Sequence, residues 1–283
     1  ALLGPEAPGL SPSTVVRLKE VWQRDYEAWS QRALTGKRYV YFWVDGIHFT
    51  VRLEDDRCCI LVIMGADSAG NKELVAISDG FRESKLSWKE ILLDLRRRGL
   101  RHGPSLTIGD GGLGLWAALP EVFPQSREQL CWVHKTANVL NKLPKSIQPK
   151  AKEKIHQIWM ASNKEEAEKS FDAFIDIYEA KYPKAVECLK KDRDVLLTFY
   201  DFPAEHWRHI RTTNPIESTF ATVKLRTAKV RGCFSAKTVQ TMAYKLCKCV
   251  QKRWIRLHRY EKLAMVIKGV KFVDGVEIDR IAA

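Results

Sequence analysis

The sequence contains no apolar run near the roughly 20 residues that a membrane-spanning helix needs. Its first residues, Ala1 to Pro5, lack the basic segment and the long apolar segment of a secretory signal peptide. The seven cysteines are an odd number and do not have the spacing of a disulfide scaffold. These absences exclude membrane-spanning, signal-bearing and disulfide-rich proteins, so we expect a soluble protein of a reducing intracellular compartment.

Acidic residues are also scarce relative to basic ones, with 34 Asp and Glu against 47 Lys and Arg. The resulting net charge of +13 and pI of about 9.4 are typical of a protein that binds a polyanion such as nucleic acid. A basic protein that is merely soluble is the alternative. Hydrophobic residues make up 45% of the chain, which is enough for one large folded domain or two small ones.

The N-terminal part predicts a helix followed by strands. Residues 10–30 have helical spacing, and they resemble either a plain amphipathic helix or the second helix of a helix-turn-helix whose first helix is missing. Residues 39–44 predict a buried strand that ends at Asp45, and two more strands are predicted at 57–64 and 73–77. Their short connections favour an antiparallel meander.

A crossover unit is predicted next. Ser87 and Glu90 have the spacing of a capping box at the start of a helix, which Gly99 ends. A fourth strand is predicted at 105–108, and a strand, a helix and a further strand favour parallel pairing. A helical turn at 113–119 leads to a candidate fifth strand at 129–133.

The remaining chain predicts helices. Residues 144–200 are rich in Lys, Glu and Ala and indicate two to four helices. Two more are expected, one from Asn214 to about Val230 and one from Ser235, with Gly232 between them. The last twenty residues are too short to classify.

Two aspartates follow predicted strands, and each is followed by glycine. Asp45 ends the first strand, and Asp110 stands in the run Gly109-Asp110-Gly111-Gly112. Ligand sites form outside the carboxyl ends of strands, where glycine lets a ligand come close to the backbone. Both are therefore candidate metal ligands, although Asp-Gly also makes a simple turn.

Glu217 is the third candidate acid. In the run Thr213-Asn214-Pro215-Ile216-Glu217, Asn214 is expected as the N-cap, followed by Pro at N1 and Glu at N3, so capping alone would account for Glu217. A carboxylate in a first helical turn can also point at a strand end. Three converging carboxylates would suit Mg²⁺, and two such ions support in-line displacement at phosphorus.

At this point the sequence resembles a known family. Four ordered segments, namely Tyr39–Phe49, the Ile108-Gly109-Asp110-Gly111 run, Cys131-Trp132-Val133-His134 and Thr213-Asn214-Pro215-Ile216-Glu217-Ser218, look like those of the Mutator-like bacterial insertion-sequence transposases. The resemblance covers roughly residues 10–260. It implies an Asp-Asp-Glu active site in which Asp45, Asp110 and Glu217 are catalytic and bind Mg²⁺, with Mn²⁺ as a substitute.

The resemblance also implies a fold and a domain order. The expected fold is α/β, a ribonuclease-H-like mixed five-stranded sheet flanked by helices, with an all-helical insertion. The domain order predicted from the chain is an N-terminal helical segment at 1–36 that is the remnant of a DNA-binding region, a core at 37–143, the insertion at 144–210, more core at 211–260 and a tail at 261–283.

The implied activity is cleavage of DNA at the ends of a mobile element, followed by attack of the freed 3′-hydroxyl on target DNA. The implied partners are element ends and target DNA, with no membrane, and a homodimer or larger assembly that brings two ends together. The expected location is the bacterial cytoplasm, at the nucleoid. Family members usually have a longer N-terminal region, so this chain is expected to have low sequence specificity.

Basic and auxiliary residues complete the predicted site. Cys131, His134 and Asn214 are auxiliary candidates, and His134 either positions substrate or is a buried core histidine. Cys131 and His134 also have the spacing of half a zinc site, with His206 and His209 as a weak second half. DNA contacts are predicted at Arg208, Arg211, Lys224, Arg226, Lys229 and Arg231. Further basic residues follow at 245–256, and a separate lysine run lies at 142–154.

Two other functions remain open from the sequence. A ribonuclease-H-like structure-specific nuclease would hydrolyse DNA without joining ends. A non-catalytic DNA-binding fragment would keep the fold and lose the chemistry. Retention of all three carboxylates in their expected contexts favours the transposase.

Overall fold

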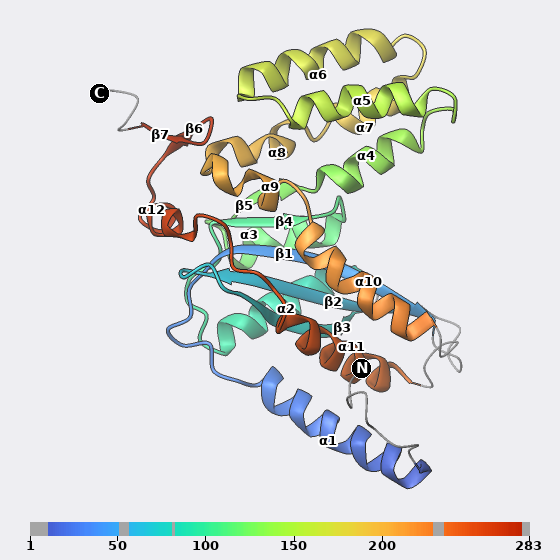
Figure 1. Ribbon diagram of the computed structural model, residues 1–283, viewed down its shortest axis with the longest axis vertical. Coiled ribbons are helices and arrows are strands. Elements are labelled where there is room, and N and C mark those ends of the chain that lie inside the picture. Colours follow the sequence, from blue (N-terminus) through green and yellow to red (C-terminus); the bar gives the residue numbers. More distant parts are fainter. Residues whose placement is uncertain (1–10, 51–56, 81–82, 229–234, 279–283) are drawn as a thin grey trace.

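The computed structural model describes residues 11–50, 57–80, 83–228 and 235–278. A mixed sheet with the strand order β3-β2-β1-β4-β5 forms its centre (Figure 1). The strands are β1 (Tyr39–Thr50), β2 (Arg57–Asp67), β3 (Lys72–Gly80), β4 (Leu106–Gly109) and β5 (Arg127–Leu130). The first three form the predicted antiparallel meander, and β4 and β5 are parallel to β1.

Two apolar clusters cover the two faces of this sheet because its buried strands alternate their side chains. On one face, Phe42 and Val44 pack against α2 (Lys85–Arg97) and α3 (Leu113–Val122), through residues such as Trp88 and Leu119. On the other face, Trp43 belongs to a cluster that includes α10 (Asn214–Ala228) and α11 (Ala236–Gln251). Figure 1 shows α10 and α11 crossing the sheet. The N-terminal helix α1 (Pro12–Ser30) packs against α11.

The helical stretch lies beyond the β5 edge of the sheet (Figure 1). A buried glutamine joins the two parts: Gln129 Nε2 donates to the Leu196 carbonyl (3.0 Å) and Gln129 Oε1 accepts from the Phe199 amide (2.8 Å). Burial makes these bonds costly to lose. The elements here are α4 (Trp132–Leu140), α5 (Gln148–Trp159), α6 (Lys164–Tyr178), α7 (Pro183–Lys190), α8 (Arg193–Leu196), η1 (Thr198–Asp201), η2 (Ala204–His206) and α9 (Trp207–Ile210).

The C-terminal segment, which the sequence left unclassified, packs on this helical part. The Gly275 amide donates to the Tyr200 carbonyl (3.0 Å), and Asp274 Oδ1 accepts from the Lys164 amide (2.6 Å). The tail is therefore anchored at two points. Its elements are η3 (Tyr260–Lys262), α12 (Leu263–Ile267), β6 (Phe272–Val273) and β7 (Val276–Glu277).

Three predicted boundaries are wrong. β1 does not end at Asp45 but continues to Thr50, because β2 pairs with it along its whole length while β4 stops earlier. Residues 131–133 do not extend β5, because Cys131 is the N-cap of α4. The cap of α2 is Ser84, whose hydroxyl accepts from the Ser87 amide (3.1 Å). Gly232, expected between the last long helices, lies outside the described residues.

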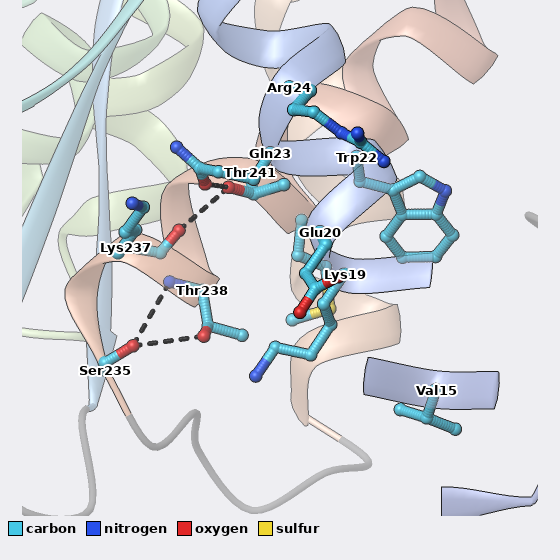
Figure 2. Close-up of a pocket in the computed structure, with 11 residues that line it drawn as sticks. Val15, Lys19, Glu20, Trp22, Gln23, Arg24, Ser235, Lys237, Thr238 and Thr241 are labelled. Atoms are coloured by element: carbon cyan, nitrogen blue, oxygen red, sulfur yellow. Dashed lines mark hydrogen bonds between the residues drawn. The ribbon is translucent and has the colours of Figure 1, made fainter. Parts of the chain in front are cut away.

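A pocket of about 700 Å³ lies between α1 and α11, which also contact each other directly (Figure 2). Trp22 and Met242 line it, and Thr241 bonds to Gln23 beside it. None of the carboxylates singled out from the sequence lines this pocket. It is therefore not the predicted site. In the described part of the chain, every helix is too short or too polar to cross a membrane.

Candidate active site

Asp45 and Asp110 lie at the same level of neighbouring parallel strands. Trp43 of β1 pairs with Ile108 of β4, and each aspartate stands two residues after that pair. The Asp45 carboxylate accepts a hydrogen bond from the Gly46 amide (2.8 Å), and the Asp110 carboxylate accepts one from the Gly112 amide (2.9 Å). The backbone thus fixes both carboxylates at the place where the β1–β4 pairing ends.

Asp45 lies close enough to Asp110 and Glu83 for their charges to affect its pKa. Burial, supported by the charges of Asp110 and Glu83 and opposed by His134, raises the pKa of Asp45 to about 7. Carboxylates that repel each other in a half-buried place need a compensating cation. The pair therefore has the charge balance of a cation site.

The carboxylate of Glu217 does not cap α10. Its Oε1 accepts from the Thr213 hydroxyl (2.6 Å) and lies 3.9 Å from His134 Nε2. In the first turn of the helix, the amides of Ile216 and Glu217 donate to the Thr213 carbonyl. The predicted N-cap role of Asn214 is therefore wrong: Asn214 is the first helical residue, and it is exposed.

His134 connects the strand carboxylates with Glu217. The Cys131 amide donates to the Gly109 carbonyl (2.7 Å), which sets the first turn of α4 beside the end of β4. A hydrogen bond with Cys131 is the main cause that raises the pKa of His134 to about 9, and the charges of Asp45 and Glu217 add to it although burial opposes it. His134 is thus a cation that interacts with two of the three predicted acids.

Glu83 is a fourth carboxylate, which the sequence pattern did not single out. Burial and the charge of Asp110 raise its pKa. Its Oε1 lies beside Gly46 and its Oε2 lies beside Gly112, each close to the position that the Cβ atom of a larger residue would take. Its position could have indicated a role, because Glu83 directly precedes Ser84, the N-cap of α2. The predicted cap was Ser87, three residues later, which left Glu83 outside the start of the helix.

The predicted zinc half-sites do not meet. His206 is buried, with Nδ1 bonded to the Tyr41 hydroxyl (2.9 Å) and Nε2 to the Arg259 carbonyl (3.0 Å). Both ring nitrogens are therefore occupied. Cys131 and His134 instead have donor atoms within 4.8 Å of each other and of Glu217.

The predicted DNA contacts have different surroundings. Arg208 is exposed and lies beside His209, whereas Arg211 stacks on the Trp159 ring (4.6 Å) and donates to the Trp159 carbonyl. Lys224 is exposed on α10. Lys229, Arg231 and the Arg226 side chain lie outside the described residues.

Arg208 has a cationic neighbour that the sequence pattern did not single out. Lys72, at the start of β3, lies over the Trp43 ring (5.9 Å), and Trp43 Nε1 donates to the His209 carbonyl (2.8 Å). Burial, Lys72 and Arg208 lower the pKa of His209 to about 4. Lys72 and Arg208 therefore concentrate positive charge on the face of the sheet to which Asp45 also belongs.

Comparisons with known proteins agree on one family. A model described as "Transposase, Mutator family" matches residues 5–256. The chain is 52% identical over 282 residues to the transposase for insertion sequence element IST2 of Acidithiobacillus ferrooxidans, which covers 97% of this chain and 93% of the relative. It is 49% identical over 272 residues to the transposase for insertion sequence element IS6120 of Mycolicibacterium smegmatis, with coverages of 96% and 84%.

Proposed function

Because the chain belongs to the Mutator family of transposases, we propose that it cleaves DNA at the ends of a mobile element and joins the freed 3′-hydroxyl to target DNA. Both steps are phosphoryl transfers, and we assign both to one Mg²⁺-dependent site formed by Asp45, Asp110 and Glu217. The observation that carries this assignment is the register of β1 with β4, which sets the two aspartates side by side.

The donor atoms of these residues suit Mg²⁺. All three offer carboxylate oxygens, the hard ligands that Mg²⁺ prefers. Burial is the main cause of the raised pKa of Asp45, and the charges of Asp110 and Glu83, which a cation would offset, add to it. Mn²⁺ is expected to substitute. Asp45, Asp110 and Glu217 would hold the metal, which would supply activation of an attacking oxygen and stabilisation of a leaving oxygen.

Hydrogen bonds within the chain fix the positions of these carboxylates. The amides of Gly46 and Gly112 fix one oxygen of each aspartate, and the Thr213 hydroxyl fixes Glu217. His134 carries a positive charge beside Glu217 and is therefore a positioning residue that keeps the helix carboxylate facing the strands. Preorganised geometry of this kind is what in-line transfer requires.

The wider architecture supports a ribonuclease-H-like core. The sheet is mixed and five-stranded with helices on both faces, as the resemblance implies, and a run of helices separates β5 from α10. We propose the domain order given above, with the helical insertion between the two parts of the core. A homodimer assembled on two DNA ends is the expected active form.

Lys224 is the DNA contact that the helix geometry favours most. It follows Glu217 by seven residues, which is about two helical turns, so both lie on the same side of α10. DNA whose phosphate reaches Glu217 would pass Lys224 one or two phosphates further along. Lys72 and Arg208 form a second place for phosphate contact. We leave Arg211 out because its guanidinium packs on Trp159.

Reversing the charge of Lys224 should weaken DNA binding. We expect Lys224→Glu to lower affinity for duplex DNA about 10-fold at moderate salt and to flatten the dependence of affinity on salt concentration. Fluorescence anisotropy with labelled duplex measures both. Lys268→Glu is the matched control, because Lys268 is also exposed but lies beyond α12. Equal losses in both variants would show that only net charge matters.

The proposed reaction is tested by end joining. Labelled duplexes that carry the ends of insertion sequence element IST2, prepared with a free 3′-hydroxyl, are incubated with the full chain, Mg²⁺ and a supercoiled plasmid. We expect label covalently joined to plasmid DNA. Shortened strands without joining would favour the nuclease, and Mg²⁺-indifferent binding without any new product would favour the non-catalytic DNA-binding fragment.

A further inference from the structure

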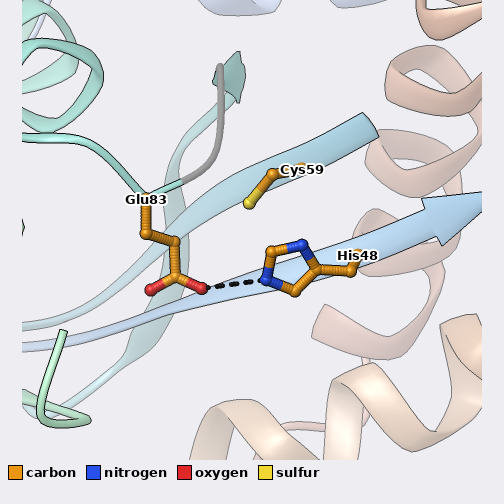
Figure 3. Close-up of side chains that lie close together, drawn as sticks. All are labelled: His48, Cys59 and Glu83. Atoms are coloured by element: carbon orange, nitrogen blue, oxygen red, sulfur yellow. Dashed lines mark hydrogen bonds and ion pairs between the residues drawn. The ribbon is translucent and has the colours of Figure 1, made fainter. Parts of the chain in front are cut away.

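Three metal-ligating side chains lie together on the face of the sheet covered by α2 and α3. His48 of β1 and Cys59 of β2 are directly opposed in the antiparallel pairing, so their side chains leave the sheet on the same side. Glu83, just before α2, reaches across to them (Figure 3). Residues distant in the sequence therefore converge on one point.

The spacing of their donor atoms fits a single cation. One donor atom from each of His48, Cys59 and Glu83 lies within 4.8 Å of the other two. His48 Nε2 and Glu83 Oε1 are 3.3 Å apart, a separation typical of two ligands on a tetrahedral ion with bonds of ~2.0–2.2 Å. Small side-chain rotations would bring the sulfur to the same ion.

We propose that His48, Cys59 and Glu83 form a binding site for a soft divalent cation such as Zn²⁺. A thiolate and an imidazole select Zn²⁺ or Co²⁺ over Mg²⁺, which prefers oxygen alone. The Cys59 thiol releases its proton to solvent as the metal–sulfur bond forms. Cys59 is buried and His48 has a half-exposed side chain, so the ion has a wall of protein on one side and a fourth position open to water on the other.

Glu83 connects this site with the proposed catalytic carboxylates. One of its oxygens faces His48, and the other borders Gly112 beside Asp110. A cation held by Glu83 offsets the negative charge that reaches Asp110 and Asp45. The proposed Zn²⁺ site is chemically distinct from the proposed Mg²⁺ site, but it is close enough to change the electrostatic environment of the Mg²⁺ ligands. Its binding of metal does not depend on DNA or on the proposed reaction.

Cobalt spectroscopy of the full chain tests this site. Co²⁺ is titrated into metal-free protein, and the thiolate-to-cobalt charge-transfer band in the near ultraviolet reports sulfur ligation. We expect one equivalent to produce the band, Zn²⁺ to displace it, and Cys59→Ser and His48→Gln each to weaken Co²⁺ binding more than ~100-fold, since even outer-shell partners of a metal contribute 10–100-fold.

Two further variants make the readout specific. Cys249→Ser changes an exposed cysteine, and Cys131→Ser changes the sulfur of the cluster with His134 and Glu217. Both should keep the band. His48→Gln alters an exposed side chain and so separates ligand loss from misfolding. No band in the unmodified chain, a band that survives Cys59→Ser or His48→Gln, or a band lost in Cys131→Ser would overturn the proposal.

Discussion

Replacing Asp45 or Asp110 by Asn, or Glu217 by Gln, is expected to lower Mg²⁺-dependent cleavage and strand transfer more than ~100-fold. Each amide keeps the shape of the acid but removes the charge that holds a cation, and loss of even an outer-shell partner of a metal costs 10–100-fold. Product formation from labelled element ends measures the effect.

The same substitutions should leave the fold intact. The pKa of Asp45 in the folded chain, about 7, lies above its ordinary value of 3.8, so its ionised form is disfavoured by folding. Without divalent ions, the stability of the unmodified chain relative to Asp45→Asn therefore falls as pH rises from about 4 to 7. At pH 8 we expect a higher melting temperature for the variant, and Mg²⁺ should narrow the gap by stabilising only the unmodified chain.

A carboxylate elsewhere supplies the control. Asp176 is exposed on α6, so Asp176→Asn removes the same charge outside the proposed site and should keep full activity. Undiminished cleavage by any one of the three site variants would remove that residue from the site. A fall in melting temperature that parallels the lost activity would assign the effect to folding instead.

The central sheet is predictable because its signals are local. The strands β1 to β4 contain apolar runs bounded by turn residues, and the helix between the third and fourth strands favours a crossover to a parallel partner. The rule leaves open which strand is the parallel partner, and the pairing of β4 with β1 is what brings Asp45 and Asp110 to the ends of neighbouring strands. The sequence does not reveal that β1 continues past Asp45, since the length of β1 depends on its pairing with β2.

The rest of the site depends on contacts that no local pattern encodes. Glu83 reaches Gly46 and Gly112 only because α2 begins at Lys85, and the choice between Ser84 and Ser87 as its cap is too close to make from residue types alone. Lys72 lies near His209 and Arg208 only because the fold brings its ammonium group over the Trp43 ring. The sequence therefore did not indicate Glu83 or Lys72, because their positions depend on a helix boundary and on long-range packing.

Gly114→Ala should be strongly destabilising and should also reduce activity. A Cβ at Gly114, in the first turn of α3, would fall on backbone atoms of Glu83, Ser84 and Lys85, which have no freedom to move aside. Separating α3 from the start of α2 would cost ~3 kcal/mol, the upper part of the range for overpacking. It would also displace Glu83 from Asp110, so the loss of cleavage should exceed the loss expected from stability alone.

Gly111→Ala is the matched control, because it adds the same methyl group three residues earlier. Within the described residues, a Cβ at Gly111 meets no atom within 4 Å. We therefore expect its melting temperature to stay within about 2 °C of the unmodified chain, while Gly114→Ala melts several degrees lower. Thermal unfolding, monitored by circular dichroism, measures both melting temperatures. If both variants melted alike, the close approach of α3 to the start of α2 would not be what requires glycine at position 114.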